Sequence, residues 1–267
     1  MTPWPDSSPP IWQVHQGVGT LTLNRPAHRN RLHDEDLRVI LQTCQAVQAD
    51  PSIRALILTA RSGPGTPVFS AGYHIGEFGQ DGAAPMPFEQ VPDALASLPV
   101  LTICALNGSV FGGATDLALA CDFRVGVWGM TLRMPAAALG LHYYPSGMQR
   151  YVARLGLGAA RRLFLLADTV ADDELLAMGY LDKRVDADAL MPTALAMAEQ
   201  AASLAPLALQ GMKQTLNEMA TSAMTPPAHD PLMQLWRHRE ARTQASADFA
   251  EGRLAFAQKR RAVFKGE

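Results

Sequence analysis

Two short segments of this chain place glycine directly after an apolar stretch, and they constrain the fold more than any other feature. The first is VFSAGYHI, Val68 to Ile75, and the second is NGSVFGGATDLALACDF, Asn107 to Phe123. Glycine at the end of a strand lets backbone N–H groups point into a cavity, because no side chain stands in the way. Two such N–H groups facing one point form an oxyanion hole, which stabilises negative charge developing on a carbonyl oxygen. On spacing alone, two tight turns explain the same glycines equally well.

The spacing of apolar residues in the first half of the chain predicts alternating strands and helices. Asp34 is a suitable N-cap, and apolar residues from Leu37 to Val47 recur at helical spacing. Ile11 to Val14 and Gly19 to Leu23 have the pattern of a hairpin. This order predicts an α/β fold of stacked right-handed βαβ units with a mostly parallel core. The further elements expected are strands at 55–59, 101–106 and 123–127, a helix at 112–120, and loops at 61–67 and 76–92.

From Pro145 onward the pattern is almost entirely helical. We expect a disordered lead-in at 1–10, a core domain at 11–200 and a helical C-terminal region at 201–267. The charged stretch from Pro226 to Glu267 is expected to end in a long helix. The remaining helices are expected at 145–155, 158–166, 172–178, 188–203 and 205–220.

Charge and cysteine usage narrow the classes of function. The net charge of -2 gives no electrostatic support for a nucleic-acid partner. No apolar run reaches the ~18 residues of a membrane span, and the proline-rich N-terminus does not have the pattern of a signal peptide. Cys44, Cys104 and Cys121 lie far apart in apolar stretches, which indicates reduced thiols in a cytoplasmic protein. Neither a CxxC motif nor a His pair at ligand spacing occurs, so we expect no metal.

The glycine segments also suggest a chemistry. Gly112 and Gly113 precede an apolar helix, whose N-terminus carries about +0.5 of an elementary charge and unpaired N–H groups. The turn after Phe69 could deliver a second N–H group to the same point. Asp116 lies one helical turn beyond Gly113, so it could face the same cavity. From the residues alone, a simple partner for the helix dipole is the more common role of such an aspartate.

Two other groups of polar residues are candidates for a site. Tyr143 and Tyr144 precede an expected helix start at Pro145, so their loop is a candidate to line a pocket, although a core or interface aromatic pair is also common. His74 follows Ser70 by four residues, which suggests a serine hydrolase. No GxSxG motif occurs in the chain, and this excludes the hydrolase of that type.

Taken together, the motifs closely resemble those of the crotonase family, also called the enoyl-CoA hydratase/isomerase family. The resemblance runs from about Ile11 to the C-terminus and includes LNRP…N, FSAGxxI, NGxxxGGxxxLxxxCD and GL…QR in the family's order. It implies the crotonase fold, with stacked ββα units and a helical C-terminal trimerisation region. It also implies a trimer or a dimer of trimers, and an acyl-CoA thioester as substrate with no separate cofactor.

The resemblance assigns roles to particular residues. By motif position, the backbone N–H groups of Tyr73 and Gly113 form the oxyanion hole that holds an enolate. The loop from Arg29 to Leu32, together with Ala71, is expected to hold the adenine and the phosphates of CoA. The residues implied in CoA binding are Arg29, Arg31, Leu32 and Ala71, with Phe256, Lys259 and Lys265 reaching it near the C-terminus, often from a neighbouring subunit.

Departures from the family pattern bear on the reaction. Hydratases use two glutamates, and these positions correspond to Asp116 and Ala136 in this chain. Alanine cannot transfer a proton, so the two-carboxylate route to hydration is not favoured. His74 stands where the family has an aspartate. The VFSAG, GSVxGGA and MxP…LG strings and Tyr143 resemble the methylmalonyl-CoA decarboxylases of the family, although Tyr73 replaces a histidine there.

These departures favour a decarboxylase-like lyase, in which Tyr143 and Asp116 place the leaving carboxylate or deliver the proton. One alternative is an enoyl-CoA hydratase or isomerase that uses Asp116 as its single carboxylate. Another, from a different class, is a non-catalytic acyl-CoA-binding protein or a scaffold that only forms trimers. A nucleic-acid-binding member of the family is a weaker alternative, because the chain is slightly acidic.

Overall fold

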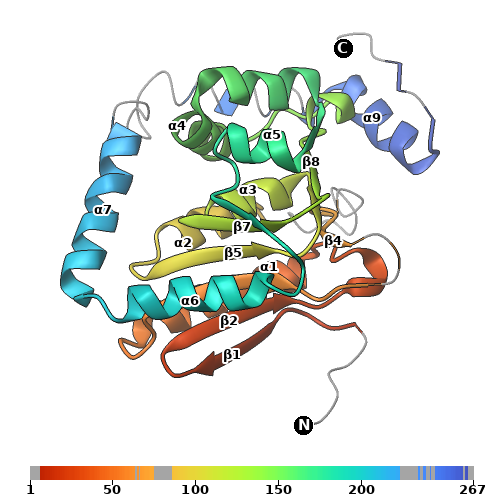
Figure 1. Ribbon diagram of the computed structural model, residues 1–267. Coiled ribbons are helices and arrows are strands. Elements are labelled where there is room, and N and C mark those ends of the chain that lie inside the picture. Colours follow the sequence, from red (N-terminus) through yellow and green to blue (C-terminus); the bar gives the residue numbers. More distant parts are fainter. Residues whose placement is uncertain are drawn as a thin grey trace.

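Within the described residues of the computed structural model, six strands form the larger of two sheets (Figure 1). Their order is β1-β2-β3-β5-β7-β10, and only the β1–β2 pair is antiparallel. The expected parallel core and the expected hairpin are therefore confirmed. The structure describes residues 7–63, 65, 67–74, 86–222, 234, 237–238, 241, 244–260 and 262–263. The strands are β1 (Ile11–His15), β2 (Val18–Leu23), β3 (Ala55–Ala60), β5 (Leu101–Leu106), β7 (Phe123–Val127) and β10 (Lys183–Val185).

A second sheet, which the sequence did not predict, is built from strands of three residues each. Its order is β4-β6-β8-β9, with β4, β6 and β8 parallel and β9 antiparallel to β8. Three residues are too few for apolar alternation to be read. This sheet carries both glycine segments, because Gly72 follows its first strand and Gly112 its second. The strands are β4 (Val68–Ser70), β6 (Ser109–Phe111), β8 (Thr131–Arg133) and β9 (Thr169–Ala171).

The helices in the first half begin close to where the sequence placed them. α1 (Asp34–Ala49) buries the predicted apolar face, but its N-cap is His33, so the assignment of that role to Asp34 was wrong by one residue. The expected loop at 76–92 is wrong at its end, since α2 (Gln90–Ala96) begins inside it. Residues 75–85 of that loop lie outside the described residues. α3 (Gly113–Leu119) begins at the second glycine of the pair.

The break expected between helices at 145–155 and 158–166 is confirmed. α4 (Pro145–Arg161) consists of two helical parts with a kink at Gly156, whose φ of 78° and ψ of 160° are not helical, and a π-helical turn (Arg162–Leu166) follows. Two short 3₁₀ helices also occur, at Pro26–His28 and Ala137–Leu139. The later helices are α5 (Asp172–Ala177), α6 (Leu190–Ala202), α7 (Pro206–Ser222) and α9 (Ala247–Ala257).

Helices pack around the larger sheet (Figure 1). β4, which precedes the first glycine segment, lies at one end of that sheet. α6 packs across β3, β5 and β7, and α7 stands at the side of the molecule. Lys213 of α7 is buried and donates to the Val100 carbonyl at 2.7 Å and to Asp122 at 2.6 Å. The exposed apolar residues of α7, such as Leu207, are not covered by the described part of the chain. The boundary expected at residue 200 stays a prediction.

All three cysteines lie in the core as free thiols, as the sequence predicted. The fold brings Cys44, Cys104 and Cys121 close enough to interact, although they are far apart in the chain. Burial, and then the neighbouring Cys121, raises the pKa of the Cys44 thiol to about 12. Such thiols stay protonated and unreactive at neutral pH. Within the described residues, no helix has the length and apolar character to cross a bilayer.

Candidate active site

The first part of the site is a backbone strip in which the loop after the first 3₁₀ helix pairs with the SAGYH segment. The N–H of Leu32 donates to the Gly72 carbonyl at 2.9 Å, and the N–H of His74 donates to the Leu32 carbonyl at 2.9 Å. These two bonds form a parallel bridge between Leu32 and Tyr73. In such a bridge the N–H of the central residue points away from its partner. The N–H of Tyr73 is therefore directed to the side opposite Leu32.

Gly72 and Gly113 approach each other closely. A Cβ atom at position 72 would lie 2.7 Å from the carbonyl oxygen of Phe111 and 3.3 Å from the nitrogen of Gly113. Gly72 also has a φ of +88°, a conformation that favours glycine. Gly113 is the first residue of α3, and within the described part of the chain its N–H donates to no acceptor. The structure thus brings together the two backbone segments that the sequence predicted for an oxyanion hole.

Aromatic rings enclose this pair of segments. The ring of Phe88 lies so close to Gly113 that a Cβ atom there would be 2.8 Å from it. The same ring is 5.5 Å from the ring of Tyr73 and 6.2 Å from that of Tyr144. The hydroxyl of Tyr73 donates to a carboxylate oxygen of Asp34 at the start of α1. Aromatic rings therefore line part of the surroundings of the two glycines, and such apolar groups strengthen a charge interaction formed beside them.

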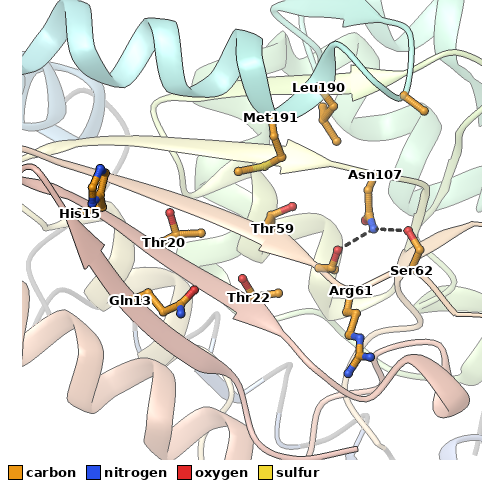
Figure 2. Close-up of a pocket in the computed structure, with 12 residues that line it drawn as sticks. Gln13, His15, Thr20, Thr22, Thr59, Arg61, Ser62, Asn107, Leu190 and Met191 are labelled. Atoms are coloured by element: carbon orange, nitrogen blue, oxygen red, sulfur yellow. Dashed lines mark hydrogen bonds between the residues drawn. The ribbon is translucent and has the colours of Figure 1, made fainter. Parts of the chain in front are cut away.

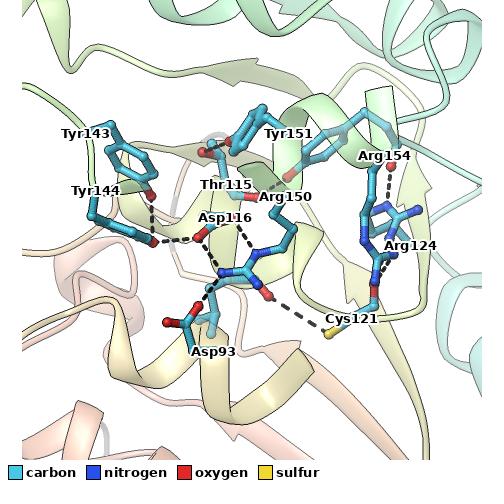
Figure 3. Close-up of polar contacts among 12 residues, drawn as sticks. Asp93, Thr115, Asp116, Cys121, Arg124, Tyr143, Tyr144, Arg150, Tyr151 and Arg154 are labelled. Carbon is cyan, nitrogen blue, oxygen red and sulfur yellow. Dashed lines mark hydrogen bonds and ion pairs between the residues drawn. The ribbon is translucent and has the colours of Figure 1, made fainter. Parts of the chain in front are cut away.

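We call the rings of Tyr73, Phe88 and Tyr144 the aromatic wall. A buried series of hydrogen bonds leads from this wall to α3 and α4 (Figure 3). The Tyr143 hydroxyl donates to the Tyr144 hydroxyl at 2.9 Å, and the Tyr144 hydroxyl donates to Oδ2 of Asp116 at 2.5 Å. Arg150 donates from Nε to Oδ1 of Asp116 at 2.8 Å and from Nη2 to Oδ2 at 3.2 Å. Nη2 of Arg150 also donates to Asp93 of α2 at 2.8 Å. Both oxygens of the predicted catalytic carboxylate are thus engaged.

Burial determines the protonation states of the hydrogen-bonded tyrosines. Asp116 is 0% exposed, so the Arg150 guanidinium and the Tyr144 hydroxyl replace its water. Burial first, and then the charge of Asp116, raises the pKa values of Tyr143 and Tyr144 well above their ordinary value. Both tyrosines are therefore neutral hydrogen-bond donors over the whole physiological range. Burial alone would lower the pKa of Arg150, but the adjacent Asp116 carboxylate outweighs this and raises it.

Gly147 lets these groups meet at the start of α4. A Cβ atom there would lie 2.5 Å from the ring of Tyr143, 2.6 Å from the ring of Tyr144 and 3.0 Å from Oδ2 of Asp116. Any side chain at this position would push the tyrosines off the carboxylate. Pro145 at the first position of the helix sets its φ and needs no partner for its nitrogen. The sequence PSG after the two tyrosines therefore favours their close packing on α4.

The residues expected to bind CoA fall into two groups. The N–H of Ala71 donates to the carbonyl of Arg29 at 2.8 Å, so the Arg29 loop and Ala71 are neighbours as predicted. Leu32 is buried in the same strip, while Nε of Arg31 is buried without a partner among the described residues. Phe256 is exposed at the end of α9, Lys259 follows it, and Lys265 lies outside the described residues. The CoA-binding roles stay a prediction.

The structure shows the surroundings of two residues that depart from the family pattern. The ring of His74 lies 5.3 Å from the ring of His33, the N-cap of α1, so His74 packs against the start of that helix. Ala136 is buried, and its carbonyl accepts from Leu139 at 3.1 Å and from Leu141 at 2.9 Å. Position 136 therefore supports a short turn and carries no acid or base.

The sequence did not predict three residues of the candidate site. Arg150 was noted only as part of the GL…QR string, and Asp93 and Phe88 gave no signal because both lie in or beside the segment expected to be a loop. A buried carboxylate requires a partner, so Asp116 inside an apolar helix was the one available indication that a cation would pack against it.

A separate cavity of about 500 Å³ lies between the larger sheet and the start of α6 (Figure 2). It contains none of the residues described above, so the candidate site and this cavity are different places. Polar side chains from β1, β2 and β3 form its floor, and Nδ2 of Asn107 donates to Ser62 beside it at 3.1 Å. The side chains that Figure 2 labels around it are Gln13, His15, Thr20, Thr22, Thr59, Arg61, Ser62, Asn107, Leu190 and Met191.

Residues 13–267 match the enoyl-CoA hydratase/isomerase family. The chain is 29% identical over 265 residues to a crotonyl-CoA hydratase of Syntrophomonas wolfei subsp. wolfei, which covers 95% of this chain and 96% of the relative. It is 30% identical to a 1,2-epoxyphenylacetyl-CoA isomerase of Escherichia coli, with 95% and 97% covered. The solved structure of methylmalonyl-CoA decarboxylase in complex with 2-nitronate-propionyl-CoA aligns with a TM-score of 0.87 at 26% identity, covering 98% of this chain and all (100%) of that one.

The close approach at Gly72 makes a testable demand on the backbone. Gly72→Ala is expected to lower the free energy of unfolding by about 1–2 kcal/mol for its positive φ, and by about 1–3 kcal/mol more for the overlap with Phe111. Gly129→Ala is the matched control, because Gly129 has a φ of +76° with nothing within 4 Å of an added Cβ. Urea unfolding of both variants measures the difference. Equal losses would mean that the two segments are not in close contact.

Proposed function

This chain belongs to the enoyl-CoA hydratase/isomerase family, and we propose that it decarboxylates an acyl-CoA thioester through an enolate. The family match and the solved structures confirm the crotonase fold that the sequence predicted. The observation that supports the proposal is the close approach of Gly72 to Gly113, because it makes neighbours of the two segments whose Tyr73 and Gly113 N–H groups are proposed to share one acceptor. A thioester oxygen at this point would receive two hydrogen bonds, and both would strengthen as the oxygen becomes negative.

The proposed reaction starts from an acyl-CoA with a carboxylate on the carbon next to the thioester carbonyl. The bond between that carbon and the carboxylate breaks, and its electron pair moves toward the carbonyl to give CO₂ and the enolate. The N–H groups of Tyr73 and Gly113 hold the enolate oxygen. A proton from solvent then adds to the same carbon and gives the shortened acyl-CoA. Tyr143 and Asp116 are proposed to place the leaving carboxylate.

The arrangement of carboxylates supports decarboxylation over hydration. Hydration needs a group that takes a proton from water and another that gives one to carbon. Ala136 supplies neither, and both oxygens of Asp116 already accept from Arg150 and Tyr144. Tyr143 and Tyr144, with their raised pKa values, cannot act as bases at neutral pH. Decarboxylation needs the enolate to be stabilised and the carboxylate to be desolvated, and the aromatic wall supplies the second condition.

A hydratase or isomerase is the second candidate, since hydratases and an isomerase are among the relatives in sequence. In that version Asp116 acts alone as the base, which requires one of its oxygens to leave Arg150 or Tyr144. A protein that binds acyl-CoA without turnover is the third candidate, and the alanine at position 136 is the feature that favours it.

The CoA part of the substrate is proposed to lie along the Arg29 loop. Arg29, Arg31 and Leu32, together with Ala71, would hold its adenine and phosphates. Phe256, Lys259 and Lys265 would reach the CoA of a neighbouring subunit, in a trimer or a dimer of trimers. No separate cofactor is required by the proposed reaction, because the thioester itself delocalises the electron pair.

Incubation with malonyl-, methylmalonyl- and crotonyl-CoA, followed by mass spectrometry of the CoA products, tests the proposed function. Loss of CO₂ from either dicarboxylic thioester is the expected result. Water addition to crotonyl-CoA without CO₂ loss would establish the hydratase instead. Binding of all three thioesters without any product would favour the non-catalytic protein.

Gly113→Pro tests the oxyanion hole, because it removes one N–H at a position where proline suits the helix. We expect turnover to fall by about 10²–10³-fold relative to Gly113→Ala. The alanine variant is the matched control, since it meets the Phe88 ring with the same Cβ atom but keeps the N–H. Circular dichroism and unfolding curves establish that both variants fold. Similar turnover of the two would place the substrate oxygen elsewhere.

A further inference from the structure

We propose that Asp116, Arg150 and Tyr144 are positioning residues that turn the hydroxyl hydrogen of Tyr143 away from the acyl group, so that a substrate carboxylate beside Tyr143 is short of hydrogen-bond donors. This inference rests on the proposed function, because it concerns an acyl group that carries a carboxylate. In this inference Asp116 is a fixed anion, Arg150 holds that anion in place, and Tyr144 connects it to Tyr143.

The anion at the end of the chain sets the direction of both hydroxyl groups. Asp116 accepts from Tyr144 at 2.5 Å, so the hydrogen of Tyr144 points to the carboxylate. The oxygen of Tyr144 is then an acceptor, and the hydrogen of Tyr143 points to it at 2.9 Å. Since an ionised carboxylate only accepts hydrogen bonds, the direction cannot be reversed while Asp116 keeps its charge.

Arg150 keeps that anion in place. Its guanidinium contacts both oxygens of Asp116, at 2.8 and 3.2 Å, and its side chain is only 12% exposed. Both oxygens of Asp116 therefore already accept hydrogen bonds, from Arg150 and from Tyr144. Arg150 is itself held by Asp93, whose side chain is 42% exposed and can be solvated. The Asp116–Arg150 ion pair is thus buried and held in place. This geometry suits a permanent anion at Asp116 and does not suit an active base.

The consequence falls on a carboxylate bound against Tyr143. The hydrogen of Tyr143 is already used by Tyr144, the two rings are stacked with centroids 4.2 Å apart, and both are buried. The ring of Phe164, 5.3 Å from that of Tyr143, closes a further side. A carboxylate placed here loses water and gains few donors in return, and leaving as neutral CO₂ removes that cost.

Tyr144→Phe separates this inference from a merely structural one. Without the Tyr144 oxygen, the Tyr143 hydrogen is free to bind the substrate carboxylate, so we expect methylmalonyl-CoA to bind about tenfold more tightly while kcat falls at least about tenfold. The dissociation constant of propionyl-CoA, which lacks the carboxylate, is expected to stay unchanged. Tyr151→Phe is the matched control, because it also removes a buried tyrosine hydroxyl. That hydroxyl donates to Thr115 and does not belong to the series of hydrogen bonds from Tyr143 to Asp116. Weaker binding of both thioesters by Tyr144→Phe would overturn the inference.

The binding measurements also keep the two proposals apart. If the wild-type protein releases no CO₂ from any thioester, the proposed function fails. The dissociation constants of methylmalonyl-CoA and propionyl-CoA still test the direction of the hydroxyl groups in that case. Tighter binding of the carboxylated thioester alone supports the inference, and equal effects on the two contradict it.

Arg150→Met tests the fixed anion without using activity. Removing the guanidinium leaves Asp116 buried and uncompensated, so the equilibrium constant for folding is expected to fall about 100-fold or more. Adding Asp116→Asn to this variant removes the charge and is expected to restore at least about tenfold of that loss. Arg162→Met is the control, because Arg162 pairs with Glu174 at the surface and such pairs contribute little. A double variant no more stable than Arg150→Met would show that Asp116 does not depend on Arg150 for its charge.

Discussion

The close backbone approach between Gly72 and the start of α3 is the constraint on which the arrangement of the site depends. A single added carbon at Gly72 would meet the carbonyl of Phe111 at 2.7 Å. The contact exists because β4 and β6 are parallel neighbours, so the residues that follow them leave the sheet side by side. The bridge between Leu32 and Tyr73 then fixes the outer edge of the same strip. Movement of either strand by one residue would separate Gly72 from the start of α3.

Features with a local cause could be predicted from the sequence. The apolar spacing of α1 follows from one buried face, and continuous apolar runs such as Ala55–Ala60 follow from burial on both faces of a parallel sheet. The glycines at 72, 112 and 113 marked the site because their conformations or close contacts exclude side chains. Where the local signal was short, prediction failed: β4, β6, β8 and β9 have three residues each, and α2 lies where a loop was expected.

Partners that are distant in the chain could not be predicted in the same way. Arg150 meets Asp116 across 34 residues and Asp93 across 57, and neither pair leaves a periodic pattern. Tyr143 and Tyr144 were singled out for their place before Pro145, but nothing local states that one bonds the other and not the substrate. The packing at Gly147 determines these bonds, since Tyr144 reaches Asp116, and Tyr143 reaches Tyr144, only because position 147 has no side chain. Tertiary packing thus decides to which acceptor each tyrosine hydroxyl donates.

In the proposed function, the charge balance around Asp116 favours a reaction that converts a substrate carboxylate to neutral CO₂. Asp93 and Asp116 share a single cation, Arg150, and only Asp93 is partly solvated. A third carboxylate, brought in by the substrate, would increase the excess of negative charge in a region lined by Phe88 and the two tyrosines. Loss of CO₂ leaves that charge on the enolate oxygen instead, at the N-terminus of α3, where it is opposed by the helix dipole. Hydration gains nothing from this difference, because the addition of water to a double bond removes no carboxylate from the substrate.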